Sequence, residues 1–100
     1  MTKGYWLVRI DITDPAKYGA YQNVVDGPLR KYAGRFLVRG GAFETKEGGA
    51  RKRNVVVEFP SYQAALDCYK SPEYQAALAK RRGGARFDFI VIDGYDGPQP

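Results

Sequence analysis

Hydrophobic and polar residues alternate along four short segments of the chain, which is the pattern of β-strands with two different faces. These segments are residues 4–12, 35–39, 54–59 and 85–93. Hydrophobic residues recur every three or four positions over residues 15–32 and again over residues 62–82, which is typical of amphipathic helices. The pattern predicts the order strand, helix, strand, strand, helix, strand.

The expected helices have recognisable ends. Asp14, Ser61 and Ser71 each stand where a side-chain oxygen can cap free backbone N–H groups, so helix is expected to start at 14–15, to start again after 61, and to restart after a short break at 71. The segment 26–28, Asp-Gly-Pro, interrupts the first helix and predicts a kink or two helical pieces. Gly34 is expected to be the left-handed residue that follows this helix.

This order of elements predicts an α+β, ferredoxin-like βαββαβ fold. Right-handed crossovers would place both helical regions on one face of a four-stranded antiparallel sheet. The length favours a single domain over residues 1–100, with a polar tail at 94–100.

The uncovered face of such a sheet mixes hydrophobic and charged side chains. If Phe36 and Val38 point at the helices, Arg39 points the opposite way, beside Arg9 and Glu58. The last strand adds either Asp88 and Ile90 or Phe89 and Val91. This surface is too apolar for solvent and too charged for a dry core, which predicts a homodimer with two sheets facing each other. A carboxylate buried there needs a cation, and Arg9 and Arg39 are the expected partners of Glu58.

Composition restricts the available chemistry. The chain has no histidine, which excludes imidazole triads and the commonest haem and zinc ligands, so no metal or other cofactor is expected. Cys68 cannot form an internal disulfide and is expected to be a buried, unreactive thiol in a reducing compartment. No signal peptide or membrane-spanning run is visible, and the expected location is therefore cytoplasmic.

The net charge of +5 admits an anionic partner. However, the basic residues lie mostly at the ends of elements. Lys80, Arg81 and Arg82 fall in a helix C-terminal turn, where cations favour the helix dipole, and are interpreted as a solvated helix end.

A small-molecule pocket is predicted in each protomer, either between sheet and helices or inside the dimer. The candidate ligand-binding residues are Arg9, Arg39, Asn54, Glu58, Tyr69 and Tyr74. The arginines would hold a carboxylate or enolate, Asn54 would donate a hydrogen bond, and Glu58 would orient the ligand or act as the catalytic base if its pKa rises. A structural ion-pair network is the competing interpretation, and tyrosines at helical spacing are typical of a core edge.

Three segments resemble a known family. They are F-L-V-R-G-G at 36–41, N-V-V-V-E-F-P-S-Y at 54–62 and C-Y-K-S-P-E-Y-Q at 68–75, and they resemble the uncharacterised bacterial family called domain of unknown function 1330 from Gly4 to about Asp93. The resemblance implies a dimeric α/β barrel, but no activity, because the family has none established. The wider superfamily includes cofactor-independent monooxygenases, muconolactone isomerase-like enzymes, stress-induced proteins and haem-degrading enzymes. The haem branch generally relies on a histidine, so haem is not expected.

Two other classes of function compete with a small-molecule pocket. RNA-recognition domains share the strand order, and residues 52–59 match their strand motif at Lys52, Val57 and Phe59. The base-stacking positions, however, fall on Asn54 and Val56, which are not aromatic, so the sequence argues against nucleic-acid binding. A non-catalytic dimeric binding or stress-related module fits the sequence as well as an enzyme does.

Overall fold

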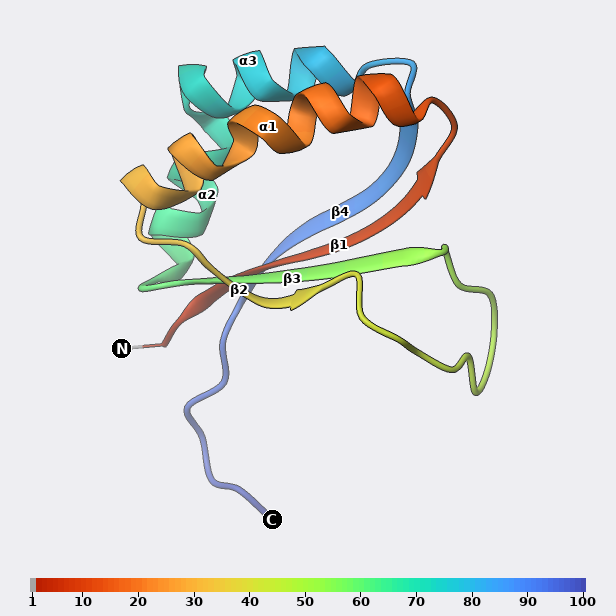
Figure 1. Cartoon of the computed structure of the whole chain (residues 1–100). Coiled ribbons are helices and arrows are strands. Elements are labelled where there is room, and N and C mark those ends of the chain that lie inside the picture. The colour runs from red at the N-terminus through yellow and green to blue at the C-terminus, as the bar shows by residue number, and fades with distance from the viewer. Residues whose placement is uncertain (1) are drawn as a thin grey trace.

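The computed structural model describes residues 2–100 and contains four strands and three helices (Figure 1). The elements are β1 (Gly4–Ile12), α1 (Pro15–Lys31), β2 (Arg35–Arg39), β3 (Arg53–Phe59), α2 (Tyr62–Lys70), α3 (Pro72–Arg81) and β4 (Ala85–Asp93). The strands agree with the predicted ranges, except that β3 begins one residue earlier. The second helical region is divided into α2 and α3 at Ser71, as predicted.

The strands form one antiparallel sheet in the order β2-β3-β1-β4. All three helices cover the same face of this sheet, which we term the helix side (Figure 1). The other face, which we term the open face, carries no helix. The predicted ferredoxin-like α+β fold is therefore confirmed, with the βαββααβ arrangement of elements.

All three predicted helix caps are present. The Asp14 carboxylate accepts hydrogen bonds from the backbone N–H groups of Ala16 and Lys17. Ser61 Oγ accepts from the first turn of α2. Ser71 Oγ accepts from Tyr74 N at 3.1 Å and donates to a carbonyl of α2 at 2.7 Å, so one hydroxyl joins α2 to α3.

Helix α1 runs without a break through Gly27 and Pro28, so of the two predicted alternatives, a kink or two helical pieces, the second is wrong. Pro28 lies in the last turn of α1, so the missing backbone N–H removes one hydrogen bond near the end of the helix. The Pro28 ring is buried. The left-handed residue after the helix is Ala33, with a φ of 58°, and not Gly34. Gly34 instead packs closely on Phe59, because a Cβ there would lie 2.9 Å from the ring.

A β-bulge interrupts β2. Phe36 pairs with Val57 and Val38 pairs with Val56, so two steps along β2 correspond to one step along β3. The inserted residue is Leu37. A bulge reverses the alternation of side chains between the two faces for the residues that follow it.

The bulge changes the face on which Arg39 lies. Arg39 and Phe36 both point to the helix side and line a cleft there, while Val38 is exposed. The expectation that Val38 faces the helices and that Arg39 lies beside Glu58 is therefore wrong. The bulge lies within the strand, before the glycines at 40 and 41.

The core between helices and sheet is centred on Trp6. Its indole N–H donates to the backbone carbonyl of Ala65 at 2.9 Å. The rings of Phe59, Tyr74 and Phe89 lie with centroids 4.9, 4.9 and 5.0 Å from that of Trp6. Aromatic residues from β1, β3, β4 and α3 therefore fix the helices against the sheet.

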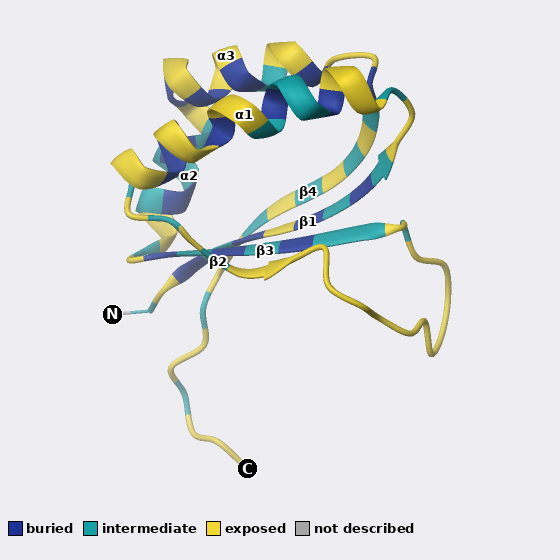
Figure 2. Cartoon of the chain, viewed as in Figure 1, coloured by how far each residue is buried: buried dark blue, intermediate teal, exposed yellow. Residues whose placement is uncertain are grey.

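The open face is partly hydrophobic, and exposed and half-buried positions alternate with buried ones along the strands (Figure 2). Leu7 is 37% exposed and Ile90 is 53% exposed. Asp88 and Ile90 belong to this face, because Phe89 and Val91 pack against the core on the helix side. The β2–β3 connection, residues 40–52, and the tail, residues 94–100, extend beyond the sheet on the open-face side (Figure 1). Across residues 2–100, no helix combines the length and hydrophobicity that crossing a membrane requires.

Candidate functional site

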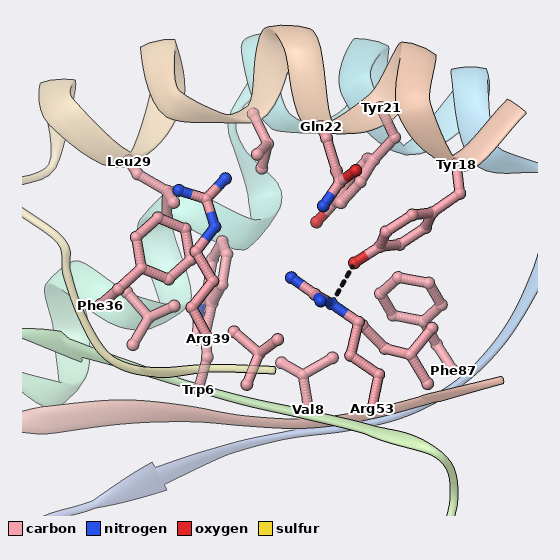
Figure 3. A pocket seen from close by; sticks show the side chains of 14 residues that line it. Trp6, Val8, Tyr18, Tyr21, Gln22, Leu29, Phe36, Arg39, Arg53 and Phe87 are labelled. Atoms are coloured by element: carbon pink, nitrogen blue, oxygen red, sulfur yellow. Dashed lines mark hydrogen bonds between the residues drawn. The ribbon is translucent and has the colours of Figure 1, made fainter. Parts of the chain in front are cut away.

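A narrow cleft lies between α1 and the helix side of the sheet (Figure 3). Its floor is apolar and comes from alternate residues of β1 and β3, among them Trp6, Val8 and Val55. Its upper wall comes from α1, where Tyr18, Tyr21, Gln22, Val25 and Leu29 recur at helical spacing. The cavity volume is about 30 Å³.

Arg53 stands at one end of the cleft. It opens β3 on the same face as Val55, so its side chain lies under α1, where its Nε–H donates to Tyr18 Oη at 3.1 Å (Figure 3). Gly40 leaves room for the guanidinium, since a Cβ at this position would collide with Arg53. Gly40 also has a φ of 71°, a conformation that favours glycine.

Arg39 stands at the other end. Its guanidinium lies 4.1 Å from the centroid of the Phe36 ring. It forms an ion pair of 3.7 Å with Asp26, in which the two side chains are 40% and 51% exposed. Leu29, Phe36 and Arg39 also line a hollow of about 230 Å³ beside Gly34, so this outer hollow adjoins the cleft at Arg39.

The electrostatic character of the cleft follows from its lining. Among residues 2–100, no carboxylate lines it and none forms an ion pair with Arg53. Burial raises the pKa of Tyr21, so this phenol keeps its proton at neutral pH. The cleft combines two cations and neutral hydrogen-bonding groups with an apolar floor, a combination that suits an organic anion.

A buried polar chain lies behind the cleft. Tyr21 Oη is 2.9 Å from Tyr74 Oη, and Arg81 Nη2 donates to Tyr74 Oη at 3.4 Å. The Arg81 guanidinium lies 3.6 Å from the Phe87 ring centroid. Arg81 is only 9% exposed, so its interpretation as part of a solvated helix end is wrong. Its spacing of seven from Tyr74 and four from Ala77 places it on the buried stripe of α3, a signal available in the sequence.

Three of the predicted site residues lie on the open face and not in the cleft. Arg9 pairs with Asn54 in the β1–β3 register, and Arg9 Nη2 donates to the carbonyl of Gly49 at 3.0 Å. Glu58 lies between Tyr5 and Arg35 on neighbouring strands.

Glu58 is held from both sides. Its carboxylate accepts a hydrogen bond from the Tyr5 hydroxyl at 3.3 Å and forms an ion pair with Arg35 at 3.6 Å. The cation beside Glu58 is therefore Arg35, and the predicted pairing with Arg9 or Arg39 is not observed.

The two predicted tyrosines belong to the core. Tyr69 packs on Trp6 and Phe89, with ring centroids 6.4 and 5.1 Å away. Tyr74 is fully buried and reaches the cleft only through Tyr21. Of the six predicted ligand-binding residues, Arg39 alone lines the cleft.

Other candidate chemistry is limited. Cys68 is buried as predicted, and burial raises the pKa of its thiol to about 12, which makes it a poor nucleophile. On the open face, Arg51 bridges Asp11 and Asp88 at 2.8 and 2.7 Å. Within residues 2–100, no three histidine, cysteine, aspartate or glutamate residues are grouped as metal ligands would be.

Solved structures share this fold. A protein of unknown function from Rhodopseudomonas palustris is 16% identical, with a TM-score of 0.73 and coverage of 96% of this chain and 85% of that one. SnoaB, a cofactor-independent oxygenase from Streptomyces nogalater, is 10% identical, with a TM-score of 0.62 and coverage of 97% of both chains. A dimeric protein of unknown function with a ferredoxin-like fold, from Bacteroides fragilis, is 12% identical, with a TM-score of 0.53 and coverage of 92% and 94%. At these identities the likeness shows the fold alone.

The sequence comparisons identify the family. No curated protein matches the chain. The model of one family, described as a domain of unknown function (DUF1330), matches residues 3–95, nearly the whole chain and the extent that the three motifs predicted. The protein therefore belongs to the DUF1330 family.

Proposed function

We propose that the protein binds a small organic anion with a largely apolar body in the cleft between α1 and the sheet. The observation that carries this proposal is Arg53, a guanidinium that lies at the rim of an apolar cleft and has no carboxylate partner within residues 2–100. A second guanidinium, that of Arg39, lies at the other end. Guanidinium groups bind carboxylates with paired, charge-assisted hydrogen bonds, and apolar walls favour the body of the ligand.

The cleft is too small for an organic ligand unless it enlarges on binding. A cavity volume of about 30 Å³ accommodates about two water molecules, whereas pockets for organic ligands usually have about 300 Å³ or more. The outer hollow adds space on the far side of Arg39. The exposed ion pair between Arg39 and Asp26 is of a weak kind. We therefore expect the ligand to draw Arg39 away from Asp26 and to extend into the hollow.

The lining favours binding over proton-transfer catalysis. Tyr21 is protonated at neutral pH, and arginine does not lose its proton in proteins. Among the described residues that line the cleft, none is a carboxylate that would serve as a base. Glu58, the predicted base, faces the opposite side of the sheet.

Trp6 supports a direct test, because it is the only tryptophan and it lines the cleft. Benzoate and 1-naphthoate are titrated at neutral pH while the fluorescence of Trp6 is followed, and affinities are checked by calorimetry. Loss of one charge-assisted hydrogen-bonding partner costs about 1.5–3 kcal/mol, so Arg53→Gln is expected to weaken binding by about 10- to 100-fold. Arg39→Gln is expected to act in the same direction.

Arg35→Gln is the matched control, since it removes the same charge from the open face. It is expected to leave binding almost unchanged. Absence of a Trp6 response to any aromatic acid, or an equal loss of affinity in the Arg35 and Arg53 variants, would contradict the proposal.

We also infer that the protein is a homodimer joined through the open face. Leu7, Ile90 and Ile92 expose hydrophobic surface there, and the similar protein from Bacteroides fragilis is described as dimeric. In such a dimer Arg9, Asn54 and Glu58 would lie between the two sheets. Light scattering at micromolar concentration tests this inference: a mass of twice 11.2 kDa is expected, and a mass of 11.2 kDa would contradict it.

A further inference from the structure

The direction of the hydrogen bond between Tyr21 and Tyr74 follows from the burial of Tyr74. The Tyr74 side chain is fully buried, and its oxygen accepts a hydrogen bond from Arg81 Nη2. Arginine only donates hydrogen bonds, so the Tyr74 proton needs a different acceptor. Among residues 2–100, the acceptor in hydrogen-bonding geometry is Tyr21 Oη, at 2.9 Å.

The opposite direction is costly. If Tyr21 donated to Tyr74, the Tyr74 proton would be left without an acceptor in the core, which costs about 1–3 kcal/mol. The favoured arrangement is a one-way chain in which Arg81 donates to Tyr74 and Tyr74 donates to Tyr21. The proton of Tyr21 then has no acceptor among the residues that the structure describes, and Tyr21 is a residue of the cleft wall (Figure 3).

We propose that Tyr21 donates a hydrogen bond to an oxygen acceptor, such as a carbonyl, on the buried end of the ligand, and that Arg81 and Tyr74 are positioning residues that fix this direction. This inference rests on the proposed function, since it concerns the same cleft. It narrows the ligand to an organic anion with a carbonyl-type oxygen at the end opposite its carboxylate. Arg53 takes the anionic end at the rim, Arg39 adds positive charge at the other end of the cleft, and Tyr21 donates to the buried end of the ligand.

Arg81 has few other roles to explain its burial. Its guanidinium stacks on Phe87, and the guanidinium carbon also lies 5.1 Å from the centroid of the Tyr21 ring. Among residues 2–100, its Nε–H has no hydrogen-bond partner and no carboxylate pairs with it. A leucine would fill an apolar site at lower cost, because an arginine without a counterion is expensive to bury. Besides stacking on Phe87, Arg81 donates to Tyr74, and because arginine never accepts a hydrogen bond, it fixes the direction of the bond between Tyr74 and Tyr21.

Two probes of nearly equal shape test the proposal. Each is an anionic benzoate, and 4-acetylbenzoate carries a carbonyl oxygen where 4-isopropylbenzoate carries a methyl group. The measured quantity is the ratio of their dissociation constants, isopropyl over acetyl, obtained by calorimetry. A neutral hydrogen bond contributes about 0.5–1.5 kcal/mol, so Tyr21→Phe is expected to lower this ratio by about 3- to 10-fold. It should change binding of 4-isopropylbenzoate by less than about 2-fold, because the shape of the cleft is kept.

The role of Arg81 has its own variants. Arg81→Met frees Tyr74 to accept from Tyr21, so the ratio is expected to fall. Arg81→Lys retains a donor-only cation and is expected to keep most of the ratio. Adding Tyr74→Phe to Arg81→Met removes the competing acceptor and should restore the ratio, a rescue that a purely structural role of Arg81 would not produce. Tyr69→Phe is the control for loss of a hydroxyl outside the cleft.

The outcomes separate this inference from the proposed function. If neither probe binds the wild-type protein, the proposed function is overturned and the inference with it. If both probes bind and Tyr21→Phe leaves the ratio unchanged, only the inference is overturned. If Tyr21→Phe lowers the ratio but Arg81→Met and Arg81→Lys do so equally, Tyr21 is the donor and the positioning role of Arg81 is wrong.

Discussion

The two faces of the sheet provide their arginines with different partners. On the open face, Arg51 is held by Asp11 and Asp88, and Arg35 lies beside Glu58. On the helix side, Arg53 donates to a phenol and Arg81 stacks on an aromatic ring. Composition alone does not show this division, because arginines are spread over both faces of the strands and over the helix ends.

The difference separates structural ion pairs from a site that accepts an anion. An arginine paired with a carboxylate in the same chain has little to gain from an external anion, because binding one means losing the partner it already has. Phenol oxygens and aromatic faces stabilise a guanidinium but leave its charge uncompensated. Within residues 2–100, Arg53 therefore keeps an uncompensated positive charge beside the cleft, whereas Arg35 and Arg51 on the open face lie against carboxylates.

The largest expected effect concerns association through the open face. Ile90→Arg introduces an unpaired charge into the proposed interface, at a cost of about 3–5 kcal/mol, and the twofold symmetry of a dimer places the change in both copies. The dimer dissociation constant is expected to rise by at least about 100-fold. Sedimentation equilibrium over a range of concentrations measures this.

Val24→Arg on α1 is the control for that experiment, because Val24 is exposed to a similar degree on a helix that covers the other face. It should leave the mass unchanged. Dissociation of the dimer by Val24→Arg but not by Ile90→Arg would show that the interface lies on the helices, and would contradict the inference that the open face forms it.

The next effect concerns Gly40, which connects backbone conformation to the cleft. Gly40 and Gly48 have φ values of 71° and 70°, but only a Cβ at Gly40 meets another group, the Arg53 guanidinium. Alanine in a left-handed conformation costs about 1–2 kcal/mol, so both Gly40→Ala and Gly48→Ala should lower the free energy of unfolding in urea. Gly40→Ala should lower it further, because Arg53 must also move.

Binding distinguishes the two glycines. Gly40→Ala is expected to weaken benzoate binding several-fold, by roughly the value of one displaced hydrogen bond. Gly48→Ala should leave binding unchanged, since nothing lies within 4 Å of its Cβ position. Equal affinities in the two variants would mean that Arg53 does not contact the ligand.

The sequence predicts the secondary structure of this protein better than it predicts the cleft. Period-two and period-three-to-four patterns predicted all four strands, the helix caps and the division at Ser71, because each depends on neighbours in sequence. The lining of the cleft depends on which residues of β2 point to the helix side, and the bulge in β2 decides this. Because Leu37 is an inserted residue, Arg39 lies on the helix side and not on the open face. No residue type in β2 is a recognisable signal for a bulge at that position.

Other residues of the site were predictable but were missed. Extending the alternation of β3 by one position places Arg53 on the same side as Val55, and the buried stripe of α3 includes Arg81. Both were overlooked because arginine is read as a surface residue by default. Ala33 is a different case, because it takes a left-handed conformation while a glycine follows it. Close packing of Gly34 on Phe59 explains why the glycine stands one position later.

The smallest expected effect is a dependence of stability on pH that comes from one face only. A hydrogen bond from the backbone N–H of Lys52 lowers the pKa of Asp11, and a hydrogen bond from the Arg51 guanidinium lowers it further. The Arg51 guanidinium also lowers the pKa of Asp88 through a hydrogen bond. A carboxyl whose pKa is lower in the folded chain stabilises the fold above its unfolded pKa, about 3.9, and loses this contribution as pH falls through the folded value. Stability should therefore decline below about pH 4, and Arg51→Met should reduce the decline. The unfolding curves of wild type and Arg51→Met should converge at low pH, where both carboxyls are protonated.

Arg53→Met provides the contrast that makes this measurement informative. Arg53 has a phenol and no carboxylate as its partner within residues 2–100, so its replacement should shift stability equally at all pH values in this range. Urea unfolding from neutral pH down to about pH 3, at one protein concentration, measures all three proteins. If Arg53→Met also flattened the pH profile, a carboxylate would be acting on the cleft, and the cleft would no longer differ from the open face in having uncompensated charge. If the profile stays as steep as that of wild type, the charge of Arg53 remains available to an anion that the chain itself does not supply.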